Sequence, residues 1–276
     1  MPKTNKARSS DAITQHYLIE KELAARLRTA TKEERRNLYT EVYDELFRRV
    51  PDHPQLAIQP EERAQEVSER LALLQGYLTP TSTYLELGPG ACSLAIEVAK
   101  HVRKVSVVDV SGEITRAIEL PQNLELIISD GSSVPVPDNS VNIAYSDQLM
   151  EHLHPDDAAD QLQNVYRALA PGGVYICITP NRLSGPHDVS SYFDDVPTGF
   201  HLREYSAREL SQLFRTAGFR KVEVLAGARG LHLTIPVQFV GALESILAKV
   251  PRRLGRTIAR GLPLKLILGI KLVGTK

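Results

Sequence analysis

Residues 84–100, with the sequence YLELGPGACSLAIEVAK, predict a strand, a turn and a helix in direct succession. The first four residues, YLEL, are typical of a short buried strand. Gly88 and Gly90, on either side of a proline, then predict a tight turn, because glycine tolerates backbone angles that a side chain would block. From residue 91 onward, Leu94, Ala95 and Val98 recur at helical spacing. This succession is the first half of a βαβ unit of the kind that binds a nucleotide at its turn.

The acidic residue Glu86 indicates which kind of nucleotide the turn can bind. It lies two residues before the first glycine, where its charge would repel the pyrophosphate of a dinucleotide. The third glycine of the pattern G-x-G-x-x-G is also replaced, by Ser93. The next apolar run, residues 105–108, ends in Asp109, from which a second strand can offer a carboxylate to a ribose. A ligand with a ribose and a cationic head fits these features, and a dinucleotide remains the alternative.

Four segments in this order resemble the class I S-adenosylmethionine-dependent methyltransferases, type 11 in particular. They are ELGPG at 86–90, SDG at 129–131, VPVPDNS at 134–140 and YRALAPGGVYICITPN at 166–181. The resemblance covers roughly residues 82–226. It implies an α/β fold with a Rossmann-like seven-stranded sheet, helices on both faces, and S-adenosylmethionine as the cofactor. The cofactor-binding residues that it implies are Glu86, Gly88, Gly90, Asp109, Asp130, Gly131, Asp147 and Gln148.

The resemblance also assigns a part of the cofactor to several of these residues. Asp109 would hold the ribose, and Asp130 would meet the adenine amino group. The backbone N–H of Gly131 would meet a nitrogen of the adenine ring. Asp147 and Gln148 would lie beside the methionine end, as would the turn after Glu86. A local turn made by the Asp-Gly pair, and a helix-capping role for residues 147–148, are the structural alternatives.

Length and composition predict a single domain with additions. The chain has 276 residues, and its 33 basic side chains equal its 33 acidic ones. Its two cysteines, Cys92 and Cys177, lie in predicted buried elements and favour a reducing compartment over a disulfide. The sequence has neither a secretory signal nor an apolar run long enough to cross a bilayer, so we expect a cytoplasmic protein.

We divide the chain into three parts. Residues 1–80 form a helical segment that could act as a lid, 81–235 the methyltransferase core, and 236–276 basic amphipathic helices. In the first part Thr31 and Glu34 form a capping-box pattern. Methyltransferases of this kind often cover the cofactor with such a segment, which makes Tyr39, Tyr43 and His53 candidate lid residues.

The last part combines apolar and basic residues. Between residues 245 and 276 there are eight Lys or Arg and no acid, so the rest of the chain is acidic. An apolar stripe recurs at helical spacing beside these bases, although Pro251 divides it into two helices. The stripe consists of Leu243, Leu247, Val250, Leu254 and Ile258. It predicts either peripheral contact of residues 243–276 with an anionic membrane or packing against the core.

Three histidines are candidate catalytic residues, because imidazole can move a proton near neutral pH. His152 follows the predicted fourth strand, and His187 and His201 lie in the long insertion 181–205, which we expect to roof the acceptor pocket. Methyl transfer needs alignment first and a base where the nucleophile must lose a proton. A purely structural role for each histidine remains open.

The remaining expectations concern the substrate. The Asn/Asp-Pro-Pro-aromatic motif of enzymes that methylate nucleic-acid amino groups is missing, so we expect a small-molecule or lipid- or sugar-linked acceptor, methylated at oxygen, and no nucleic acid. His152, His154, Asp156 and Asp157 could also suggest a metal site, but we expect no metal, because consecutive acids after His-Pro are typical of a helix start. The alternatives are a nucleotide-dependent oxidoreductase and a non-catalytic module. The oligomeric state cannot be predicted.

Overall fold

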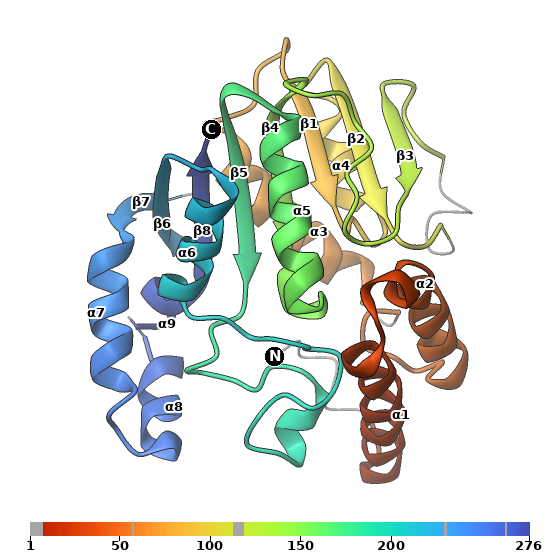
Figure 1. Cartoon of the computed structure of the whole chain (residues 1–276), viewed down its shortest axis with the longest axis vertical. Helices are drawn as coiled ribbons and strands as arrows, with labels where there is room; N and C mark the ends of the chain where they lie inside the picture. Colours follow the sequence, from red (N-terminus) through yellow and green to blue (C-terminus); the bar gives the residue numbers. More distant parts are fainter. Residues whose placement is uncertain (1–7, 57, 113–118, 229–230, 263) are drawn as a thin grey trace.

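The computed structural model describes residues 8–56, 58–112, 119–228, 231–262 and 264–276. Within these residues eight strands form one sheet, in the order β3-β2-β1-β4-β5-β8-β6-β7 (Figure 1). The predicted α/β fold is therefore confirmed, but the sheet has one strand more than the predicted seven. The short helix that we expect over 111–120 falls mostly outside the described residues.

The first five strands are parallel and β8 and β7 run against their neighbours. Their bounds are β1 Thr83–Leu87, β2 Lys104–Asp109, β3 Leu124–Ile128, β4 Val141–Asp147, β5 Leu169–Thr179, β6 Lys221–Ala228, β7 Leu231–Pro236 and β8 Ile270–Thr275. Strands β6 and β7 form an antiparallel hairpin at the edge of the sheet. Parallel strands bring their carboxyl ends to one side of the sheet, which is where ligands bind in such folds.

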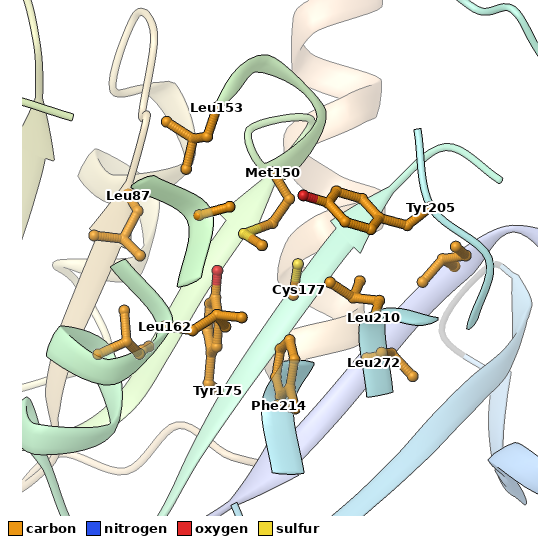
Figure 2. Packing of buried hydrophobic residues seen from close by; sticks show 14 of the residues in the cluster. Leu87, Met150, Leu153, Leu162, Tyr175, Cys177, Tyr205, Leu210, Phe214 and Leu272 are labelled. Atoms are coloured by element: carbon orange, nitrogen blue, oxygen red, sulfur yellow. The ribbon is translucent and has the colours of Figure 1, made fainter. Parts of the chain in front are cut away.

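Helices cover both faces of the sheet, as expected. α3 (Pro60–Leu74) and α4 (Ser93–Val98) pack together on one face, whereas α5 (Pro155–Ala168) and α6 (Ala207–Ala217) pack together on the other (Figure 1). Two buried apolar clusters, one on each face, follow from this arrangement. Figure 2 shows part of the larger cluster, in which the rings of Tyr175 in β5 and Phe214 in α6 stack with centroids 5.2 Å apart.

The N-terminal helices α1 (Ser10–Thr29) and α2 (Lys32–Arg49) lie beyond the carboxyl ends of β1, β2 and β3 (Figure 1). The predicted capping box is present, because the Glu34 carboxylate accepts from the Thr31 N–H at 2.7 Å and the Thr31 hydroxyl accepts from the Glu34 N–H. A buried apolar row on each helix, including Leu23, Leu27 and Leu46, joins the larger core cluster. These helices are thus packed onto the end of the sheet where a ligand would bind.

The C-terminal segment departs from the prediction in one respect. Helices α7 (Val237–Leu247), α8 (Arg252–Arg260) and α9 (Leu264–Leu268) are present, and Pro251 separates α7 from α8 as expected. Residues 270–275, however, form strand β8 and not a helix. The predicted apolar stripe is also divided, since Leu247 is buried and Leu254 is 53% exposed. None of the described helices is both long and apolar enough to span a bilayer.

Strand β8 forms because its neighbours on both sides leave a gap that only an extended segment can fill. It pairs antiparallel with β5 on one side and β6 on the other. Gly274 allows α6 and the following loop to pack onto the strand, because a Cβ there would lie 2.6 Å from Cδ1 of Phe214 and 2.7 Å from Cδ1 of Phe219. The basic and apolar residues before this strand recur at helical spacing, so the sequence pattern predicts helix up to the end of the segment.

Candidate active site

A cavity lies at the carboxyl ends of β1, β2 and β3, between the sheet and α2. Three glycines line it, Gly88, Gly90 and Gly131, and all three have positive φ angles. The sequence uses glycine at these turns because left-handed backbone strains any residue with a side chain. Other residues that line the cavity are Tyr39, Tyr43, Phe47, Gln55, Asp109, Gln148, Leu149 and His152.

The aromatic residues of α2 close this cavity from the outside. Tyr39 lies against Gly131, where a Cβ would come within 3.0 Å of its ring. Tyr43 and Phe47 lie one and two turns further along the same helix and also line the cavity. Of the candidate lid residues, Tyr39 and Tyr43 therefore contact this cavity, whereas His53 lines an adjacent chamber.

Asp109 lines the cavity from the end of β2. One of its carboxylate oxygens accepts from the backbone N–H groups of Val110, at 2.7 Å, and Ser111, at 3.2 Å. Burial raises the pKa of Asp109, although these N–H groups partly offset the effect. The carboxylate is thus fixed in position at the end of β2, in the wall of the cavity.

The charge around the cavity favours a cationic ligand. Among its described lining residues none is a lysine or arginine, so nothing there would neutralise a pyrophosphate. Glu86 does not line the cavity but is buried in β1 just before its glycine turn, where it accepts from the Tyr84 hydroxyl at 3.1 Å. Burial raises the pKa of Glu86 to about 8. A nearby cation such as an ammonium would favour the ionised form of this carboxylate.

Two other predicted cofactor residues are engaged elsewhere. The carboxylate of Asp130 accepts from the N–H groups of Ser132 and Ser133, at 3.0 and 2.7 Å, so Asp130 closes a local turn. Asp147 is paired with Arg70 of α3 and accepts from the Tyr145 hydroxyl. Neither side chain lines the cavity. For Asp130 the structural alternative, an Asx-type turn, describes the arrangement.

A second chamber of about 240 Å³ adjoins the cavity, and the two share Tyr43, Gln55, Gln148 and His152. Its walls come from α1, from the turn after α2 and from the insertion 181–205. Residues that line it include His16, Glu20, His53, His187, Asp188, Phe200 and His201. The insertion is built around a short 3-10 helix, η3 (Val189–Tyr192), and borders the chamber; its role as a roof over the acceptor stays a prediction. All three predicted catalytic histidines meet here.

His152 lies where the two cavities join. It ends the short 3-10 helix η2 (Met150–His152), and its Nδ1 is 3.1 Å from the carbonyl oxygen of Phe200. A carbonyl only accepts, so Nδ1 carries the proton and Nε2 keeps a lone pair. Burial, together with the neighbouring charge of His201, lowers the pKa of His152 to about 3. The neutral ring can therefore accept a hydrogen bond but is a weak base.

His187 and His201 share one acid. Oε1 of Glu204 lies 2.8 Å from Nδ1 of His201 and 3.2 Å from Nδ1 of His187. Burial alone would lower the pKa of His201, but the hydrogen bond to Glu204 and the charges of Glu151, Glu204 and Asp188 raise it to about 9. The insertion thus holds His201 firmly inside the chamber and His187 nearer its edge.

Two residues of the chamber were not predicted from the sequence, His16 and Glu20. His16 Nε2 is 2.7 Å from Glu20 Oε1, and the ring of His53 packs against that of His16 with centroids 4.8 Å apart. The sequence feature that could have indicated this pair is the i, i+4 spacing of His16 and Glu20, which places both side chains on one face of a helix. Nothing in the sequence shows that this face meets the insertion.

Two groups of described residues could hold a metal ion, His16 with Glu20 and His53, and Glu151 with His152 and His201. Of the group weighed from the sequence, which was His152, His154, Asp156 and Asp157, only His152 belongs to either of these donor sets. His154 caps α5, accepting from the Asp156 N–H at 3.3 Å, and Asp157 is paired with Arg35.

Comparison with known proteins agrees with this geometry. The family model described as a methyltransferase domain matches residues 60–224, which is more than half of the chain. The chain belongs to the methyltransferase-domain family. The resemblance to class I S-adenosylmethionine-dependent methyltransferases, and to their cofactor, is thereby confirmed.

Relatives of this methyltransferase-domain protein match over part of their length. A protein of Mycolicibacterium smegmatis named "Probable S-adenosylmethionine-dependent methyltransferase" is 37% identical over 102 residues, which is 37% of each chain. The Mycobacterium tuberculosis protein Rv3030, of the same description, is 32% identical over 110 residues, or 40% of this chain and 38% of its own. The chain thus aligns with well under half of either relative.

The fold is shared with solved methyltransferase structures. A candidate methyltransferase of Haloferax volcanii, solved in complex with the activator Trm112, superposes with a TM-score of 0.53 at 20% identity. The match covers 78% of this chain and 91% of that one. At this identity the likeness concerns the fold alone.

Proposed function

We propose that the protein transfers the methyl group of S-adenosylmethionine to an oxygen of a small hydroxylated acceptor, free or linked to a lipid or sugar. The observation that carries this proposal is the junction of the two cavities at His152. A cofactor in the glycine-lined cavity and an acceptor in the histidine-lined chamber would meet at the four residues that both share. Such a junction is what a displacement reaction requires, because nucleophile and methyl carbon must approach in line.

Each group in the cofactor cavity has a role in this proposal. Asp109 would accept hydrogen bonds from the ribose hydroxyls, and the open backbone at Gly90 would let the ligand lie close to the turn. The carboxylate of buried Glu86 does not line the cavity. When ionised, it would attract the cationic methionine end of the cofactor through its charge, without direct contact. When bound, the cofactor supplies a methyl group on a sulfonium, which leaves as a neutral thioether when an acceptor lone pair attacks the carbon. The acceptor must lose its hydroxyl proton in the same overall reaction.

The chamber favours a polar acceptor. Its described walls carry the imidazoles of His152 and His201 and the side-chain amides of Gln55 and Gln148, so a hydroxyl-rich molecule would find both donors and acceptors there. Nε2 of His152 would accept a hydrogen bond from the acceptor hydroxyl and so turn its oxygen toward the cofactor. With a pKa of about 3 this ring orients the oxygen more than it deprotonates it. Orientation alone can contribute about 7–11 kcal/mol to such a reaction.

The proposal can be tested with a cofactor whose methyl group carries deuterium. The purified protein is incubated with this cofactor and with a polar metabolite or lipid extract, and labelled products are found by mass spectrometry. We expect a labelled product with the native protein and, at a cofactor concentration near the native Kd, far less product with the Asp109→Ala variant. Binding of NAD in place of S-adenosylmethionine, with no labelled product, would support the oxidoreductase alternative. Binding of S-adenosylmethionine without a labelled product from any extract would support the alternative of a non-catalytic module.

Peripheral membrane contact of the C-terminal helices is a second proposed property. Phe239 and Ile246 on α7 are 71% and 64% exposed, and Leu254 on α8 is 53% exposed. Exposed Lys249, Arg252 and Arg253 lie in or beside the link between the two helices. These helices lie at the edge of the molecule away from β3 (Figure 1). Exposed apolar groups beside bases suit the interface of an anionic bilayer, where a lipid-linked acceptor would be found.

A further inference from the structure

His152, at the junction of the two cavities, forms a donor set with His201 of the chamber wall and with Glu151, which is buried behind them and lines neither cavity. Glu151 and His152 belong to η2 after β4, whereas His201 comes from the insertion after β5. One nitrogen or oxygen from each lies within 4.8 Å of the others. Glu151 is fully buried and His201 is 6% exposed. Two imidazoles and one carboxylate are a common ligand set for divalent transition metals.

The two histidines are oriented as metal ligands usually are. Nδ1 of His201 donates to the carboxylate of Glu204 at 2.8 Å, and Nδ1 of His152 donates to the carbonyl of Phe200 at 3.1 Å. Both rings therefore direct Nε2 away from these anchors. Metal-bound histidines typically hold their second nitrogen by a carboxylate or a carbonyl in this way, which fixes both tautomer and ring position. A cation at Nε2 of His201 displaces any proton held there, and Glu204 still holds the ring.

Glu151 gives the independent observation. Its Oε2 accepts from the Thr179 hydroxyl at 2.8 Å, but within the described part of the chain its Oε1 is buried without a hydrogen-bond partner. A buried carboxylate oxygen with no partner is costly, and native structures contain few of them. A cation between Glu151 and the two imidazoles would supply the missing partner.

The other histidine cluster does not have this property. Arg8 lies 2.8 Å from Nδ1 of His16, whose Nε2 is bonded to Oε1 of Glu20. The second oxygen of Glu20 accepts from the Phe200 N–H at 3.2 Å. Both ring nitrogens of His16 and both carboxylate oxygens of Glu20 are thus already bonded. The guanidinium of Arg8 would also repel an entering cation. This cluster is a buried hydrogen-bond network that shapes the wall of the chamber.

We propose that Glu151, His152 and His201 bind one divalent transition-metal ion, of the class of Zn²⁺ or Mn²⁺, at the junction of cofactor cavity and acceptor chamber. Its role rests on the proposed function. An acceptor hydroxyl that takes an open position on the ion becomes more acidic and loses its proton to solvent, which leaves an alkoxide oxygen to attack the methyl carbon. With the ion bound, Nε2 of His152 would be a metal ligand, so the ion and not His152 would orient the acceptor oxygen and favour its deprotonation.

Metal binding is measured without any acceptor, so that it does not depend on activity. The full chain is treated with a chelator, and Zn²⁺, Mn²⁺ and Co²⁺ are then titrated by calorimetry, with the visible absorption of Co²⁺ as a second readout. We expect one site per chain, lost in Glu151→Gln and in His201→Asn. Removal of the anchor in Glu204→Ala should weaken binding by about 10- to 100-fold. The matched control is His16→Asn, in the other cluster, which should leave the affinity unchanged.

Two results would overturn the proposed site. One is equal metal affinity in the native protein and Glu151→Gln, and the other is loss of the site in His16→Asn with retention in His201→Asn. S-adenosylmethionine affinity in each variant shows that the chain is folded. A chelated protein that methylates at full rate refutes the proposed role of the ion in deprotonation and leaves the proposed function intact. A protein that binds one ion through these residues but methylates nothing refutes the proposed function and leaves the site.

Discussion

The guanidinium of Arg35 binds both carboxylate oxygens of Asp157, with Nε at 2.6 Å from Oδ2 and an Nη at 2.9 Å from Oδ1. The two residues are 122 positions apart and join α2 to α5. Tyr39 donates to the same carboxylate at 2.7 Å and accepts from the His154 N–H. The helix that lines the cofactor cavity is therefore fixed to the sheet domain by a buried, fully bonded charge pair.

Loss of one partner of this pair should be costly. Arg35→Ala leaves the Asp157 carboxylate buried without its counter-ion, so we expect the free energy of unfolding to fall by about 3–5 kcal/mol. Because α2 carries Tyr39 and Tyr43, cofactor affinity should fall as well. Chemical denaturation and calorimetry measure the two effects. The neighbouring Arg36→Ala, at an exposed position, serves as the control and should change neither. Equal stability of the two variants would show that the pair does not fix the helix.

Asp109 should be the residue on which cofactor affinity depends most. Asp109→Ala removes hydrogen bonds to a charged acceptor, each worth about 1.5–3 kcal/mol. We therefore expect S-adenosylmethionine to bind about 10- to 150-fold more weakly for each bond lost. Calorimetric titration of the variant tests this, with exposed Asp138→Ala as the matched acid control. Unchanged affinity in Asp109→Ala would remove this residue from the cofactor site.

Glu86 should make the stability of the cofactor-free protein depend on pH. Its pKa in the folded protein is about 8, whereas its ordinary value is 4.5. Between these values the folded protein holds a proton that the unfolded chain releases, so stability must fall as pH rises through this window. The contribution of one such group is at most about 1.4 kcal/mol per pH unit.

Glu86→Gln removes this ionisation and should flatten the dependence between pH 5 and pH 8. Denaturant unfolding at several pH values measures the slope. Glu97→Gln is a suitable control, because Glu97 is bonded to Lys100 near the surface and should not alter the slope. If native protein and Glu86→Gln lose stability in parallel, Glu86 is ionised in the folded state throughout.

The C-terminal helices should bind anionic vesicles. We expect the full chain to co-sediment with phosphatidylserine-containing liposomes at low salt and to be released at high salt, because exposed charges are screened. Each basic residue near such a surface contributes about 1 kcal/mol, so the double variant Arg252→Ala/Arg253→Ala should bind about 30-fold more weakly. A native protein that stays in the supernatant at low salt excludes membrane docking. Arg63→Ala in α3 is the control for general charge effects.

Most of the fold could be predicted because its signals are local. The strand and turn around Gly88, and the helix start at Thr31, each depend on residues within a few positions of one another. Strand β8 was missed for the opposite reason. The segment 270–275 is short and follows a helical pattern. It becomes a strand because it pairs with β5 on one side and β6 on the other.

The candidate site was predictable only where backbone conformation defines it. The glycine turns and Asp109 lie in the cavity because each ends a parallel strand. The engagement of Asp147 by Arg70 depends on how α3 packs, which no local pattern reports. The chamber likewise requires α1 to meet the insertion 181–205, a contact between segments far apart in sequence.

The position of β8 has a consequence for the order of folding. Strands β1 to β5 can pair as the chain emerges, but the β6–β7 hairpin joins them only through β8, which follows it by an entire group of helices. Closing a loop of that length costs entropy before any contact repays it, so this step should be late and slow. Until then the free edge of β5 is an unpaired template that can recruit another chain. During synthesis, nascent chains that lack β8 should therefore be the species that chaperones retain.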